Sequence, residues 1–233
     1  MVAVAAICTV LIIKVWPGVL IGSRNLETEG YVFANFTRVE ISSAFEFEIK
    51  QSSSYSINVT ADDNVIDYVQ VSQDGQTLKI RLGTVPSLRL VTLKASVTMP
   101  QLGGLTVSGA SRGTVSEFSS TEGLNITVSG ASRVTGDIFT AGDIEFDVSG
   151  ASTIQLQGFA DNMVAVVSGA SRFNLGEFTI NNVNVNISGA STGTINLNGR
   201  LDANISGAST LLYIGEPIMG TINTSGASTI SKK

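Results

Sequence analysis

The sequence predicts an all-β protein whose main part is a single-stranded parallel β-helix, a solenoid in which turns of about 20 residues stack on one another. Three observations predict it. The tetrapeptide Ser-Gly-Ala-Ser recurs at spacings of 21, 20, 19, 20, 18 and 19 residues. Alternating polar and apolar residues precede the first six copies, and no helical stretch separates them. The seven copies start at Ser108, Ser129, Ser149, Ser168, Ser188, Ser206 and Ser225.

Each repeat is too short to bury an apolar face alone, so it must stack on its neighbours. Equivalent residues of successive turns, or rungs, then form columns along the solenoid axis, about 4.8 Å apart. The first inward column is Val107, Val128, Val148, Val167, Ile187 and Ile205, with Thr224 at a fraying end. The second inward column, two residues earlier, is Ile126, Phe146, Ala165, Val185 and Ala203.

The tetrapeptide itself fits a corner of the solenoid. Its glycine supplies a conformation or a close approach that a Cβ would obstruct. We expect the following alanine to stack inside the bend and the serine hydroxyls to hydrogen-bond along the stack. A hydrogen-bonded corner is the main interpretation of the serine array, and a binding surface, for instance for glycans, is the alternative.

Upstream of the repeat, which we assign to residues 103–233, residues 23–102 are β-rich but lack the tetrapeptide. We expect this part to supply less regular rungs or a cap over the first rung. Asp74-Gly75 is typical of a hairpin turn, and residues 62–69 fit one short helical turn. At the other end, Lys232 and Lys233 carry charges that discourage edge-to-edge strand pairing.

Residues 1–22 are almost entirely apolar, interrupted by Lys14 and by the helix-breaking Pro17. Their length approaches one bilayer span, so we interpret them as a hydrophobic export signal or membrane anchor. The alternative is a buried N-terminal strand or helix of the domain. Cys8 is a poor lipidation site, because Ile7 stands where a lipoprotein signal has a small residue.

Composition excludes several classes of function. The chain has no His and one Cys, which removes serine–histidine and cysteine–histidine nucleophiles and zinc clusters. Lys and Arg number 8 against 9 Asp and Glu in residues 1–102, and 6 against 10 in residues 103–233. Neither part is basic, so nucleic acid is not an expected partner. We expect no catalytic residues, no cofactor and no metal.

Charged and amide side chains also fall into outward columns. Asp143, Glu145 and Asp147 alternate on one strand. The next rung offers an apolar floor and no aromatic platform for a sugar, so a solvated acidic face is favoured over a glycosidase or a calcium site. A second column holds Arg112, Arg133 and Arg172, interpreted as solvated corner positions rather than a polyanion site. Asn186, Asn204 and Asn223 form a third column, interpreted as a stacked amide ladder.

One outward pair breaks the polar pattern. Val164 and Val166 lie between Glu145 and Asp147 on one rung and Asn184 and Asn186 on the other. An exposed apolar spot rimmed by polar groups is typical of a contact. We therefore hypothesise that this pair is a contact patch, with cover by a loop as the alternative.

Several segments resemble the head GIN domain family of proposed bacterial autotransporter adhesins. They are FTRVEISSAFEFEIKQSSSYSINVTADDN, DGQTLKIRL and the serial VSGASR and VSGAST units. The resemblance covers residues 23–233 and implies a β-helix-like, exported or membrane-linked protein. It brings no catalytic residues, because the family's molecular function is unassigned.

Together these observations favour a non-enzymatic, adhesin-like interaction module. We expect it to be exported to the cell surface or envelope and tethered to the membrane by its N-terminal segment. The partner could be a surface protein, a glycan or a second copy of the chain. One alternative is a structural unit of an oligomer or surface filament, assembled through the helix ends or the N-terminal segment. A third is an envelope carbohydrate-active enzyme.

Overall fold

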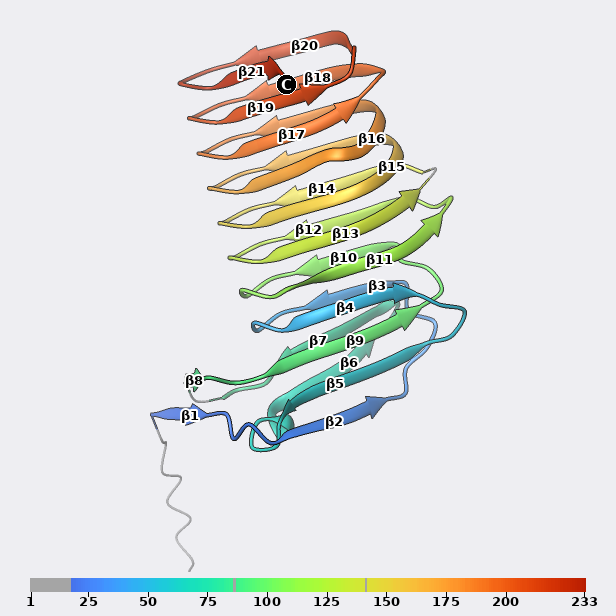
Figure 1. The fold of residues 1–233 in the computed structure, drawn as a ribbon, viewed down its shortest axis with the longest axis vertical. Coiled ribbons are helices and arrows are strands. Elements are labelled where there is room, and N and C mark those ends of the chain that lie inside the picture. The colour runs from blue at the N-terminus through green and yellow to red at the C-terminus, as the bar shows by residue number, and fades with distance from the viewer. Residues whose placement is uncertain (1–17, 86, 141) are drawn as a thin grey trace, which may run out of the picture.

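The computed structural model describes residues 18–85, 87–140 and 142–233. It confirms the predicted parallel β-solenoid, with rungs of about 20 residues stacked along one axis (Figure 1). Most of the predicted export or anchor segment lies outside the described residues. Its described part contributes β1 (Val19–Ile21), which pairs in parallel with β8 (Ser87–Arg89).

The rungs form two sheet faces that meet at the repeated corners. In spatial order, face A contains β6 (Val69–Asp74), β7 (Thr77–Leu82), β3 (Arg38–Ile41), β10 (Gly104–Val107), β12 (Leu124–Val128), β14 (Ile144–Val148), the second halves of β15 (Thr153–Val167) and β16 (Arg172–Ile187), β18 (Arg200–Ile205) and β20 (Ile218–Thr224). Face B contains β2 (Leu26–Tyr31), β5 (Ser56–Asp62), β9 (Leu93–Met99), β4 (Glu46–Gln51), β11 (Arg112–Ser120), β13 (Arg133–Thr140), the first halves of β15 and β16, β17 (Thr192–Leu197), β19 (Thr210–Ile214) and β21 (Thr229–Lys232).

The core lies between the two faces and follows the predicted columns. Every predicted member from Val107 to Ile205 in the first column is buried, as is every member of the second. Phe146 packs edge-on against Phe173, with ring centroids 5.0 Å apart. Thr224 pairs with Ile205 but is exposed, because no described rung covers it.

The repeated glycines form the corner as predicted. All seven have φ between 65° and 80°, in the left-handed region. A Cβ at Gly150 would fall inside van der Waals contact of the Gly130 carbonyl oxygen in the rung below. The amide of the alanine after each of these glycines bonds to the rung below: Ala151 N donates to Gly130 O at 2.7 Å, and Ala170 N donates to Gly150 O at 2.7 Å.

The expected position of the alanine was wrong. In every copy the alanine is exposed, and the second serine is inside in the first six copies. The left-handed glycine turns the chain so that the alanine amide faces the rung below and its methyl group faces solvent. The inward hydroxyls of Ser191 and Ser209 donate to glycine carbonyls below, each at 3.3 Å. Three other inward hydroxyls, those of Ser111, Ser132 and Ser152, have no partner among the described residues.

The N-terminal part combines rungs with a cap, and its order in space differs from its order in sequence. The rung of β3 and β4 lies between the rung of β7 and β9 and that of β10 and β11. Its corner, residues 42–45, lacks the repeated motif and places buried Phe45 where later rungs have serine. Asp74-Gly75 forms the predicted antiparallel hairpin, and the predicted helical turn is the 3-10 helix η1 (Ile66–Tyr68).

Strand β2 caps face B by pairing antiparallel with β5. Buried Asp62 holds the cap together, because its carboxylate accepts hydrogen bonds from Arg24 N and Thr92 N, each at 2.6 Å. These two bonds join β5 to the chain before β2 and to the chain before β9. Strands β2 and β6 are therefore the outermost strands at the N-terminal end, and β20 and β21 form the other end of the described stack.

The corner geometry predicts opposite outcomes for two neighbouring substitutions. Gly150→Val should lower the free energy of unfolding by about 3 kcal/mol or more, because of the left-handed φ and the close Gly130 carbonyl. Ser152→Ala should change it by less than about 1 kcal/mol, because it removes a buried hydroxyl that has no partner. Urea denaturation measures both, and equal losses would contradict this account of the corner.

The core columns predict a large cavity effect. Phe146→Ala should lower the free energy of unfolding by about 3–5 kcal/mol, since Phe146 is 1% exposed and packs against Phe173. Thermal and chemical denaturation measure the loss. A change below about 1 kcal/mol would show that the register of this strand is shifted by one residue.

Candidate functional site

On face A, the predicted apolar pair lies in the open. Val164 and Val166 are 46% and 45% exposed. They pair in register with Glu145 and Asp147 of β14 on one side and with two asparagines of β16 on the other. The patch is therefore uncovered within the described residues, and its role as a contact stays a prediction.

The asparagine column next to this pair forms the predicted ladder. Asn204 Nδ2 donates to Asn186 Oδ1 at 3.0 Å, and Asn223 Nδ2 donates to Asn204 Oδ1 at 2.7 Å. In the adjacent column, the carboxylate of Asp202 accepts hydrogen bonds from Arg200 and from Thr221 N, and these bonds lower its pKa. The side-chain amides of this asparagine column therefore hydrogen-bond mainly to one another.

The acidic and basic columns are exposed as predicted, but two members have partners. Asp143 Oδ1 accepts a hydrogen bond from Asn162 Nδ2 at 2.8 Å. Arg112 forms an ion pair with Glu46 at 2.7 Å. Arg133 follows Arg112 in register, and a threonine separates it from Arg172. In the described ranges, no three His, Cys, Asp or Glu side chains are placed to hold a metal ion.

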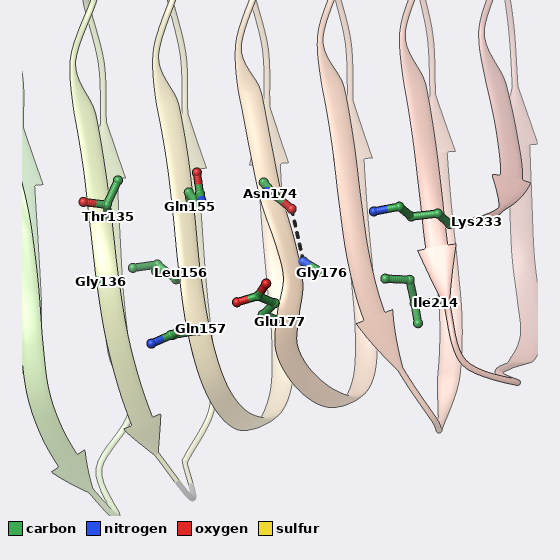
Figure 2. A pocket seen from close by; sticks show the side chains of 10 residues that line it. All are labelled: Thr135, Gly136, Gln155, Leu156, Gln157, Asn174, Gly176, Glu177, Ile214 and Lys233. Atoms are coloured by element: carbon green, nitrogen blue, oxygen red, sulfur yellow. Dashed lines mark hydrogen bonds between the residues drawn. The ribbon is translucent and has the colours of Figure 1, made fainter.

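Face B carries a pocket that the sequence analysis did not predict. It has a volume of about 310 Å³, at the lower end of the range for ligand sites. Figure 2 shows its amide and carboxylate side chains projecting from the adjacent strands β15 and β16. The lining residues are Thr135, Gly136, Gln155, Leu156, Gln157, Asn174, Gly176, Glu177, Ile214 and Lys233.

A β-bulge shapes this pocket. Gln155 pairs with Asn174 and Gln157 pairs with Glu177, so β16 has one more residue than β15 between the two pairs. Asn174 Oδ1 accepts a hydrogen bond from Gly176 N at 3.2 Å inside the bulge (Figure 2). The extra residue redirects the strand and determines where the Glu177 carboxylate points.

Two glycines of face B, two register positions apart on neighbouring strands, adopt a backbone that other residues rarely adopt. Gly136 has φ 139° and Gly158 has φ 135°. A Cβ on either would overlap a carbonyl oxygen of the rung below, that of Val115 or of Ile138. Unusual backbone geometry thus also occurs at the pocket, which Gly136 lines, and next to Gln157, which Gly158 follows.

Next to the pocket lies a pair of exposed aromatic rings. Phe139 and Phe159 are register partners, 39% and 46% exposed, with ring centroids 5.7 Å apart. This aromatic pair of face B was not among the features predicted from the sequence. The only sign of it in the sequence is the spacing of Phe139 and Phe159, which are 20 residues, or one rung, apart.

The fold and these surfaces define a β-solenoid that displays columns of exposed side chains on two faces. Residues 35–217 match the family described as "Putative auto-transporter adhesin, head GIN domain". The chain therefore belongs to the head GIN domain family, as the resemblance of its sequence motifs implied. None of the helices within residues 18–85, 87–140 and 142–233 has the length and apolar character to cross a bilayer.

Solved structures share the fold at low sequence identity. A "putative adhesin" from Bacteroides fragilis superposes with a TM-score of 0.80 at 21% identity, covering 92% of this chain and 100% of its own. One from Parabacteroides merdae gives 0.71 at 18% identity, with coverage of 93% and 100%. A "putative lipid binding protein" from Parabacteroides distasonis gives 0.68 at 21%, with coverage of 92% and 99%. The curated proteins include no match to the chain.

The strained glycines predict a local stability effect. Gly158→Ala should lower the free energy of unfolding by about 2 kcal/mol or more, because φ 135° and the Ile138 carbonyl both oppose a Cβ. Gly103→Ala is the matched control, since its Cβ would meet nothing closer than 3.7 Å. Differential scanning calorimetry measures both. A smaller loss for Gly158→Ala than for the control would show that β15 is not constrained as described.

Proposed function

We propose that the protein is a non-enzymatic, adhesin-like interaction module of the cell surface or envelope. Residues 1–22 would direct its export or tether it to a membrane. The observation that carries the proposal is the display of exposed side-chain columns by a rigid solenoid, including the uncovered pair Val164 and Val166. A binding surface needs only such fixed geometry, whereas catalysis needs reactive groups brought together.

The side chains present favour binding over hydrolysis. A glycosidase needs two carboxylates across a scissile bond, one of them protonated. The acidic strand of face A instead borders Val164 and Val166, and Asp143 is engaged by Asn162. An apolar pair framed by carboxylates and amides is the composition of a small contact surface.

A second candidate function is self-assembly through the open end of the described stack. Ile218 and Met219 of the end strand β20 are 70% and 45% exposed. Outer strand edges pair readily with other strands unless charge or shape prevents it. Size-exclusion chromatography with light scattering, with and without residues 1–22, tests this candidate. Large assemblies that persist without residues 1–22 would favour a filament assembled through this end, and assemblies lost on truncation would assign the contact to the N-terminal segment instead.

The proposed module predicts a separation of folding from adhesion. Val164→Asn with Val166→Asn extends the neighbouring asparagine columns without touching the core, so the melting temperature should change by less than about 3 °C. Beads coated with the full chain should adhere to fibronectin, collagen or mucin surfaces, and the double variant should lose about tenfold in retained beads.

The matched control for this experiment is Thr106→Asn with Thr127→Asn, a double change on the same face, away from the valines. It should keep the adhesion of the unmodified chain. If the valine variant adheres as well as the control, the pair is not the contact. If the unmodified chain adheres to none of the three surfaces, the adhesin proposal loses its support from these partners.

A further inference from the structure

We infer that face B carries a binding site for a neutral oligosaccharide, formed by the pocket of Figure 2 and the aromatic pair beside it. This inference goes beyond the proposed function, because it adds a second binding surface, on face B, that is separate from Val164 and Val166. We call the site the amide trough. It consists of Gln155, Gln157, Asn174, Glu177, Phe139 and Phe159.

Three polar side chains of the amide trough are free to bind a ligand. Among the described residues, the side chains of Gln155, Gln157 and Glu177 make no hydrogen bond, and all three are exposed. Each glutamine offers two N–H donors and one carbonyl acceptor, and the carboxylate offers acceptors only. Register pairing places Gln157 and Glu177 about 4.8 Å apart on neighbouring strands. Donors and acceptors at this spacing suit adjacent hydroxyl groups.

The aromatic pair supplies an apolar surface next to these groups. Gln157 and Phe159 are two residues apart on β15 and point to the same side, about 7 Å from each other. The two rings are tilted by 55° and together cover the width of two rungs. A pyranose has apolar C–H faces and hydroxyls around its rim. Seated on the rings, it would direct those hydroxyls toward Gln157 and Glu177.

The charge of the pocket favours a neutral sugar over an acidic one. Its lining contains one carboxylate, Glu177, and one ammonium group, Lys233. The nearby carboxylate of Asp137 accepts a hydrogen bond from Glu117 N at 2.9 Å, so it is held in place beside the trough. Arg133 and Arg172 lie beyond the pocket, in the column next to the corner.

A peptide strand fits this surface less well than a sugar. Peptides commonly bind by adding a strand to a free sheet edge. The trough instead lies in the middle of face B, where β13, β15 and β16 each pair on both sides. Side chains alone are therefore available to a ligand. The bulge and the unusual glycines constrain the backbone positions from which these side chains project.

The test is an array printed with neutral hexose and N-acetylhexosamine oligosaccharides, and with sialylated and sulfated ones, probed with the purified full chain. We expect binding to neutral members. Phe139→Ala with Phe159→Ala should reduce that binding by about tenfold or more, and Gln157→Ala should also reduce it. Phe159→Tyr keeps the ring and should retain binding. Val164→Asn with Val166→Asn, on face A, should leave it unchanged.

Circular dichroism melting curves confirm that each variant is folded. The inference is overturned if the folded chain binds no neutral oligosaccharide, binds only acidic ones, or binds equally well without the two phenylalanines. Bead adhesion separates this failure from failure of the proposed function. If adhesion persists in the phenylalanine variant but is lost in the valine variant, the proposed adhesin function is supported and the amide trough has no part in adhesion.

Discussion

The structure depends on one constraint, a corner at which each rung of the Ser-Gly-Ala-Ser repeat turns through a left-handed glycine, which from Gly150 onward packs directly on the glycine below. The Ala151 amide reaches the Gly130 carbonyl at 2.7 Å, and the same bond recurs from Ala170 to Gly150. This contact leaves no room for a Cβ. Because the repeat rungs all turn at the same point, the strands that follow stay in register and the inward side chains line up as columns.

The register at the corner also determines which side chains lie next to one another on the outer surface of the two faces. Face A keeps its alternation from β10 to β18 and has a register shift only where β20 pairs with β18, so its outward residues form columns with an asparagine ladder and an apolar pair. Face B departs from that regularity away from the corner, where β16 has a bulge and Gly136 and Gly158 adopt unusual φ values. The irregular level coincides with the pocket and the exposed aromatic pair. The repeat thus provides a rigid frame, and local departures from it provide a shaped surface.

The repeat made the solenoid and its core columns predictable, because a two-residue period and a fixed rung length place Phe146 inside and Val164 outside. Other features depend on contacts that sequence spacing does not encode. The inward serine follows from the direction of the chain after the left-handed glycine. The rung of β3 and β4 has a corner without the motif, and its position between later strands follows from non-local pairing. The pocket arises from a one-residue bulge, which no periodicity reveals.

Amide hydrogen exchange at the corner tests the central constraint most directly. Because Ala151, Ala170 and Ala190 donate to the glycine carbonyls below, their amides should exchange only through global unfolding. NMR of the folded chain should find them at least about a thousandfold slower than unprotected amides, and as slow as the core strand residues around Val148. Rapid exchange at these alanines with protected strands on either side would contradict the account, because the rungs would then be stacked by their strands alone.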